Sequence, residues 1–462
     1  MGDVLSYLNC AFRCTVIVFF ASTASPALAL SLTEALDLAR HSDPQLLTAQ
    51  ANQRVARERS AQAFGAILPQ ASIAINTTGN RRNYQVQDSD APPARNIYNS
   101  NSAQLNVTQA IFHRSNQIAL LQSSAAERQA GYLLLAAEQD LLVRLTQAWF
   151  DLMLARDVLV YSNAQVAATE YLSRQAVQAA ASGLASGPMR EEATSKYAQA
   201  VAELAGAESD QNLKLAALEQ ITGALPPLTP PMLSDAYVAR DPRSESLAQF
   251  LQYVEQNNPQ ILAAVNGVEA AAEEIRKQRT GHEITIDAVG SYGRTVQNTG
   301  SFPGQSGSEV KLRAIGLQVN IPLYSGGTQS AKVGEAIALR DKTAQELEAA
   351  KRQARLNAKQ AWFGWQTGDA HQLAALQMRK SADLALQAAT QGKRLDVKSD
   401  ADVLQARQQR DSALRDYQKA RYEKITSYIK LQSTIGQLQD ADVTALDRWL
   451  VAQRDSTKAS LP

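Results

Sequence analysis

The chain of 462 residues carries the same order of sequence features twice, and this duplication limits its fold more than anything else. The run Gln-Ala-Trp-Phe at 147–150 recurs at 360–363, an offset of 213 residues. The run Pro-Gln at 44–45 recurs at 259–260, an offset of 215 residues. Shared motifs in one order and at nearly one spacing predict two structural repeats.

Each repeat contains one predicted strand hairpin, where the hydrophobic period changes from 3.6 to 2. In the first hairpin Leu105 and Val107 alternate with polar residues, and in the second Ile315 and Leu317 do so. Each hairpin therefore has an apolar face and a polar or small-residue face. The polar segment 80–93 has no strand pattern, so we expect it to be a loop.

The last predicted strand contains an exception to this alternation. Lys311 and Arg313 fall on its apolar phase. We therefore expect the strand to leave a bilayer, or to bulge, before Ala314.

A very long helix is predicted after each hairpin. Residues 115–181 contain no proline, and neither do residues 328–391. Some 65 helical residues would reach on the order of 100 Å, which exceeds an ordinary globular domain. Each long helix ends in a turn, after which a second helix returns.

The N-terminus is typical of a secretory signal, with Arg13 before a short apolar run and Ala27-Leu28-Ala29 as the cleavage motif. Both cysteines, Cys10 and Cys14, lie in this segment, so the mature chain would contain no disulfide. The predicted division of the chain is a signal peptide at 1–29, a first repeat at 30–235 (strand hairpin 70–112, long helices 115–182 and 189–222), a second repeat at 236–437 (strand hairpin 283–324, long helices 328–391 and 400–436), and a C-terminal tail at 438–462.

Four amphipathic strands are too few to close a membrane barrel, because the smallest closed barrels have about eight. No other segment of the chain has 18 consecutive apolar residues. Either several chains pool their strands around a wet lumen, or the strands form a soluble sheet on helices. The secretion signal and the length of the helices favour pooled strands.

Other functional classes find little support in the sequence. A net charge of +1 argues against a nucleic-acid binder, which needs a concentrated basic surface. The four histidines have no second ligand at helical spacing, so we expect no metal site, no cofactor and no enzyme activity.

Three motifs add a family resemblance: Leu68-Pro69-Gln70 before the first strand, Ile-Pro-Leu-Tyr-Ser-Gly-Gly at 321–327 and Ala-Asp-Val-Leu-Gln-Ala at 401–406. With the duplication, they make nearly the whole mature chain resemble the TolC family of Gram-negative outer-membrane exit ducts. The resemblance implies an α+β membrane protein that forms a homotrimer. Each protomer would contribute four strands to a shared twelve-stranded β-barrel in outer-membrane lipid, continued by an α-helical coiled-coil tunnel in the periplasm. The tail near 440–450 would belong to an equatorial belt around this tunnel.

The same resemblance implies a passive export channel that works with a periplasmic adaptor and an inner-membrane ABC or proton-driven transporter. Type I protein secretion is the favoured role, and multidrug efflux is the alternative. A soluble periplasmic coiled-coil adaptor is an alternative of another class.

The resemblance also implies functional residues at the tips of the long helices. The adaptor-contact turns would contain, in the first turn, Gly183, Leu184 and Ser186 and, in the second turn, Val397 and Ser399. Asp402 matches the first position of an acidic ring that selects cations. Lys398 matches a basic gate residue that would pair between neighbouring helices.

This chain departs from the family pattern at two positions near the second tip. Gln405 stands where a second acidic residue of the ring is expected, so we expect a weaker ring. In the second turn the family usually has a glycine before a basic residue, whereas this chain has Asp396-Val397-Lys398-Ser399, so the second adaptor contact follows the family pattern less closely. Asp396, Asp400 and Asp402 could instead be ordinary acids at a helix N-terminus.

Overall fold

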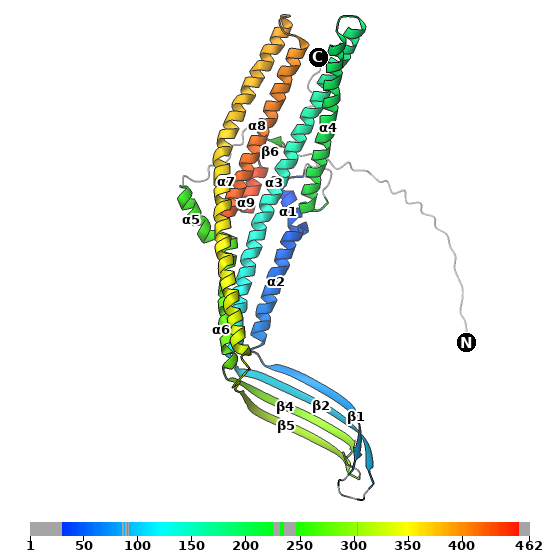
Figure 1. Cartoon of the computed structure of the whole chain (residues 1–462), viewed down its shortest axis with the longest axis vertical. Coiled ribbons are helices and arrows are strands. Elements are labelled where there is room, and N and C mark those ends of the chain that lie inside the picture. Colours follow the sequence, from blue (N-terminus) through cyan, green and yellow to red (C-terminus); the bar gives the residue numbers. More distant parts are fainter. Residues whose placement is uncertain are drawn as a thin grey trace, which may run out of the picture.

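The computed structural model describes residues 30–451 except 86, 88, 89, 91, 225–231, 235–245 and 303. The expected signal sequence, its cleavage position and the boundary between the repeats near 235 therefore lie outside the described residues, as does the tail after 451. The described part is elongated, with a sheet at one end and long helices that run away from it (Figure 1).

Two helices span the helical part from the sheet to the far end, α3 (Arg114–Ala181) and α7 (Thr328–Arg394). Beside α3 lie α2 (Pro44–Gly65), nearer the sheet, and α4 (Gly187–Thr222), at the far end. Beside α7, in the same order, lie α6 (Pro259–Arg279) and α8 (Asp400–Thr434). Helix α3 also contacts α6 and α8, which joins the two repeats. Among the described residues, none of the helices combines the length and apolarity needed to cross a membrane.

The short helices at the start of each repeat begin with the same capping motif. Helices α1 (Leu32–Ser42) and α5 (Leu247–Asn257) are both preceded by a serine in a capping box, Ser31 and Ser246. The hydroxyl of each serine accepts a hydrogen bond from an amide that would otherwise lack a partner in the first turn. Asp43 and Asn258 then cap α2 and α6, each followed by a proline at the first helical position.

The sheet contains four antiparallel strands in the order β1-β2-β4-β5. Their bounds are Gln70–Tyr84, Ala94–Phe112, Thr285–Thr299 and Ser306–Asn320. The hairpins of the two repeats meet along β2 and β4, so β1 and β5 are the edge strands of this sheet.

One expectation for these strands was wrong, and of the two alternatives for the last strand the bulge is not observed. Residues 80–84 continue β1, and Tyr84 pairs with Ala94, because backbone hydrogen bonding extends the ladder where the side-chain alternation has ended. Strand β5 has no bulge before Ala314: its pairing with β4 is regular across Lys311 and Arg313. The irregularity lies instead in β2, between Ala110 and Phe112.

The largest buried core lies about halfway along the helices. It surrounds Trp149 and Phe150 of α3 and includes residues of α1, α8 and α9 (Asp440–Asp447). Phe150 stacks on Tyr422, with ring centroids 5.3 Å apart. A smaller core of the second repeat surrounds Phe250, which contacts Trp362. Two short strands, β3 (Met232–Leu233) and β6 (Leu450–Val451), pair nearby, and a 3₁₀ turn at Thr280–His282 follows α6.

A buried ion pair joins the start of α2 to the middle of α3. Asp43 is 2% exposed and accepts two hydrogen bonds from the Arg144 guanidinium, at 3.1 and 2.9 Å. Burial raises the pKa of Asp43, but hydrogen bonds from Arg144 and from the Leu46 and Gln45 amides outweigh it, so the pKa lies below its ordinary value. A cavity of about 500 Å³ opens beside the pair.

Candidate functional site: the helical tips and an adjoining groove

The two turns at the far end of the helices have one backbone geometry. In the first turn Gly183 is left-handed (φ 74°), and the Leu184 amide donates to the Ala179 carbonyl at 2.8 Å. In the second, Asp396 is left-handed (φ 56°), and the Val397 amide donates to the Gly392 carbonyl at 2.9 Å. These positions are related by the repeat offset of 213 residues. Asp396 therefore takes the conformation that glycine takes in the first turn, which aspartate tolerates better than most residues.

Both turns expose an apolar side chain at the equivalent position. Leu184 is 85% exposed and Val397 is 76% exposed. Ser186 and Ser399 follow at the N-caps of α4 and α8. The structure thus places all five predicted contact residues at one end of the molecule, in two turns of matching shape (Figure 1).

Asp402 and Ser399 form a capping box at the start of α8. The Ser399 amide and hydroxyl donate to the Asp402 carboxylate at 2.9 and 2.8 Å, and the Asp402 amide donates back to the hydroxyl at 3.2 Å. The Ser399 amide and hydroxyl hold the pKa of Asp402 below its ordinary value, and Lys398 adds to this effect. Asp402 therefore has a structural role at the helix terminus and remains ionised at neutral pH.

The other predicted gate residues lie close to this turn. The Lys398 ammonium is 3.8 Å from the Asp402 carboxylate of its own chain. Gln405 is exposed one turn further along α8. Lys393 pairs with Asp400, which links the end of α7 to the start of α8. Pairing of Lys398 with a neighbouring helix stays a prediction, as do the roles of Asp402 and Gln405 in an aperture.

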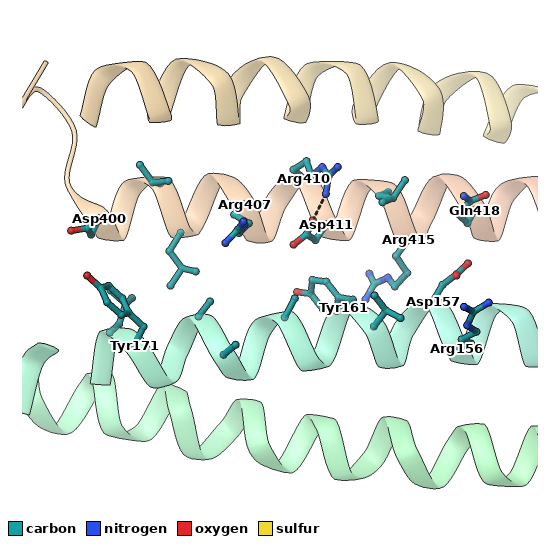
Figure 2. A pocket seen from close by; sticks show the side chains of 18 residues that line it. Arg156, Asp157, Tyr161, Tyr171, Asp400, Arg407, Arg410, Asp411, Arg415 and Gln418 are labelled. Atoms are coloured by element: carbon teal, nitrogen blue, oxygen red, sulfur yellow. Dashed lines mark hydrogen bonds and ion pairs between the residues drawn. The ribbon is translucent and has the colours of Figure 1, made fainter. Parts of the chain in front are cut away.

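A groove of about 710 Å³ runs between α3 and α8, from the second tip toward the middle of the helices. Its lining combines apolar residues with four arginines and three aspartates, shown in Figure 2. Arg410 pairs with Asp411 at 2.9 Å and with Asp383 of α7 at 3.2 Å, and Arg415 lies over the Tyr161 ring, 5.8 Å from its centroid.

The end of the groove nearer the core contains a partly buried acid, Asp157. The Tyr422 hydroxyl donates to the Asp157 carboxylate at 3.1 Å. Burial raises the pKa of Asp157, and burial together with the nearby Asp157 charge raises the pKa of Tyr422. Close by, the buried Arg421 of α8 donates to the carbonyl of Ser234, which follows β3.

The sequence did not predict this groove. Arg407, Asp411 and Arg415 recur at steps of four residues, and Arg410 follows Arg407 by three, which places them on one side of α8. That spacing predicts a polar helix face, but it does not predict which element lies opposite this face. Within the described ranges, no cluster of three or more His, Cys, Asp or Glu side chains could hold a metal ion.

Comparison with known proteins agrees with this architecture. Residues 250–437 match the family model of the outer membrane efflux proteins. The chain is 27% identical to the outer membrane protein TolC of Vibrio cholerae, over 91% of this chain and 94% of that protein. It is 24% identical to the proteases secretion protein PrtF of Dickeya chrysanthemi, over 94% of each.

A solved structure shows the same fold. The CmeC outer membrane channel of Campylobacter jejuni superimposes with a TM-score of 0.71 at 16% identity, over 91% of this chain and 89% of that one. The comparisons confirm the expected fold class and the outer-membrane location, and they do not support the soluble adaptor. The two repeats, the four-stranded sheet and the paired long helices are similar to those of outer-membrane efflux channels, and these similarities support a TolC-family export duct.

Proposed function

We propose that three copies of this chain assemble into a passive export channel in the outer membrane. The observation that carries the proposal is the sheet of four strands with β1 and β5 at its edges. An exposed edge presents backbone groups that need hydrogen-bond partners, and four strands cannot close a barrel. Pairing β5 of one copy with β1 of the next satisfies these edges and produces a twelve-stranded barrel.

The two faces of the sheet support this arrangement. Ile315 and Leu317 alternate along β5 with Gly316 and Gln318, and Ile315 is 96% exposed in the single chain. A row of large apolar side chains on one face of a strand, opposite a polar face, is the pattern of strands that face lipid. The opposite face is polar or small and suits a water-filled lumen.

The helices would continue this lumen through the periplasm. Helix α3 has 68 residues and α7 has 67, so each spans about 100 Å. Three copies would supply three pairs of such helices around one axis, each accompanied by its shorter neighbours. The proposed channel contains no covalent step, so the energy for transport comes from an inner-membrane ABC or proton-driven transporter.

The helical tips would be the docking site of a periplasmic adaptor. Leu184 and Val397 offer two exposed apolar contacts in turns of the same shape. The groove between α3 and α8 is open to a partner helix with an apolar stripe and charged flanks. We propose type I secretion of proteins as the transport process, as the name of the relative PrtF indicates for that protein. Drug efflux is the second candidate, since another relative, 24% identical, is the outer membrane efflux protein BepC of Brucella suis.

The first test is the assembly itself. The purified protein should run as a heat-modifiable trimer and should conduct ions in a planar bilayer. A monomer that leaves bilayers unchanged would refute the channel. Deletion of the gene, followed by assays of secreted proteins and of drug sensitivity, distinguishes the two transport processes.

The second test addresses docking. The variant Leu184→Asp with Val397→Asp should lose transport in cells while the trimer and its conductance persist. The matched control is Leu213→Asp with Leu373→Asp, because these leucines are 66% and 70% exposed but lie on α4 and α7 away from the turns. Equal loss of transport in both variants would contradict docking at the tips.

A further inference from the structure

Three cations gather on one face of the hairpin formed by β4 and β5. Arg294 lies opposite Lys311 in the strand pairing, and Tyr292 lies opposite Arg313. Because side chains point to alternate faces along a strand, these four residues share one face of the sheet, together with Glu309. Lys311 and Arg313 are the two residues that broke the apolar alternation of the sequence.

The same face carries the apolar residues that would contact lipid. Ile315, Leu317 and Val319 follow Arg313 on the same phase of β5 and are 96%, 71% and 52% exposed. Ile321 and Leu323 continue this phase beyond the strand. From Ile315 to Leu323 the chain can extend about 26 Å, which at a strand tilt of about 40° corresponds to a height of about 20 Å, most of the apolar band of outer-membrane barrels, about 25 Å tall.

The cations therefore lie directly at one border of the apolar band. The opposite border is next to the helices, because β5 runs toward α7 after Asn320 (Figure 1). In the proposed orientation, with the helices in the periplasm, the cations lie at the level of the headgroups in the outer leaflet. Tyr292, at the same level, is typical of the aromatic residues that line this border.

The cluster has more positive charge than its single carboxylate can balance. Glu309 accepts hydrogen bonds from Arg294 at 3.0 and 3.2 Å, and its Oε1 atom is 3.3 Å from the Lys311 ammonium. The Arg313 guanidinium lies over the Tyr292 ring, 5.5 Å from its centroid. The side chains of Arg294 and Lys311 are 59% and 62% exposed, so they can contact a further anion.

We propose that this cluster binds the phosphate groups of a phosphorylated glycolipid in the outer leaflet. Arginine and lysine at this border would hold the phosphates, and the acyl chains would lie along the apolar band formed by Ile315, Leu317 and Val319. The charge excess and the direct continuity of cations with the apolar band favour a lipid over a soluble anion. This inference rests on the proposed function, because it requires the sheet to stand in the membrane.

Binding of lipid A to the purified protein in detergent tests the proposal. The probes are lipid A with two phosphates, lipid A without phosphates, and inorganic phosphate as a competitor. Wild type should prefer the bisphosphorylated form. The variant R294Q/K311Q/R313Q should bind that form at least about tenfold more weakly, because it loses charge-assisted contacts. Both proteins should bind the dephosphorylated form equally, and inorganic phosphate should not displace the lipid.

Two further variants distinguish a loss of lipid recognition from misfolding and from a general loss of positive charge. E309Q removes the competing carboxylate and should bind the bisphosphorylated lipid more tightly, a gain that misfolding cannot produce. The control R190Q/K196Q/K214Q removes three cations from α4, far from the sheet, and should bind like wild type.

The outcomes also separate this inference from the proposed function. The lipid site is refuted, and the channel is not, if the protein is a trimeric channel that binds lipid A equally well with and without phosphates. The same conclusion holds if the α4 control loses as much lipid affinity as the variant of the sheet. A protein that forms no trimeric channel overturns both.

Discussion

The buried ion pair between Asp43 and Arg144 provides the sharpest prediction about the stability of the helical part. We compare Arg144→Met with Asp43→Asn. The methionine keeps the aliphatic volume but leaves a carboxylate that is 2% exposed without its cation. The asparagine keeps the helix cap, since asparagine is as good an N-cap as aspartate, and Arg144 retains Asp140 at 2.5 Å.

The structure sets the size of the two effects. Removing one partner of a fully buried pair costs about 3–5 kcal/mol, because an uncompensated charge remains. The Arg144 side chain is 26% exposed and a cavity adjoins the pair, so solvent screens part of this cost. We expect Arg144→Met to lower the free energy of unfolding by about 2–3 kcal/mol, and Asp43→Asn by about 1 kcal/mol. The double variant should cost less than the sum of the two, because the two sites interact directly.

The assay is guanidinium unfolding in detergent, followed by circular dichroism at 222 nm. Since the folded pKa of Asp43 is depressed, the pair stabilises wild type fully above the ordinary value of 3.8 and loses this contribution as the pH falls through the folded pKa. In Arg144→Met, burial would raise the pKa of Asp43. The difference in free energy of unfolding between wild type and Arg144→Met should therefore become smaller as the pH falls. If Arg144→Met is no more harmful than Asp43→Asn at neutral pH, the reasoning is refuted.

Three further predictions concern the tips and the core. Asp402→Ala should lower cation selectivity and the block by multivalent cations, while Asp402→Asn should do so without removing a side-chain acceptor for Ser399; unchanged reversal potentials in single-channel recordings would speak against an acidic ring. Asp396→Gly should stabilise the second turn by about 1 kcal/mol in thermal unfolding, because glycine adopts φ 56° without strain, whereas a loss of stability would show that the aspartate side chain matters. Trp149→Ala should cost about 3–5 kcal/mol, and the repeat-equivalent Trp362→Ala clearly less, since Trp149 is 1% exposed and Trp362 is only partly buried; equal losses in the same denaturation assay would contradict this account of the core.

The periodicity of the sequence predicted the class and order of the main elements. The long helices, observed at Arg114–Ala181 and Thr328–Arg394, were expected at 115–182 and 328–391. Such signals are local, because a helix or strand repeats its apolar residues every 3.6 or 2 positions. The same rule failed in β1 beyond Asn80, where pairing with β2 extends the strand although its side chains no longer alternate.

In the candidate site, too, the features set by neighbouring residues were predicted, and those set by distant residues were not. The motifs near 183–186 and 396–402 identified the tips, because turn residues and helix caps lie within a few positions of one another. The groove between α3 and α8 brings Asp157 to Tyr422 across 265 positions, and no local pattern specifies that pair.

By itself, the sequence determined that this protein consists of two repeats, each with one amphipathic hairpin and two long helices. Only the tertiary structure decided which faces meet: β2 against β4, α3 against α8, and Asp43 against Arg144. It also decided that Asp396 takes a glycine-like conformation and that Lys311 and Arg313 stay in a regular strand. The physical reason is that periodicity records the environment of one element, whereas the choice of partner depends on packing and charge summed over residues that are distant along the chain.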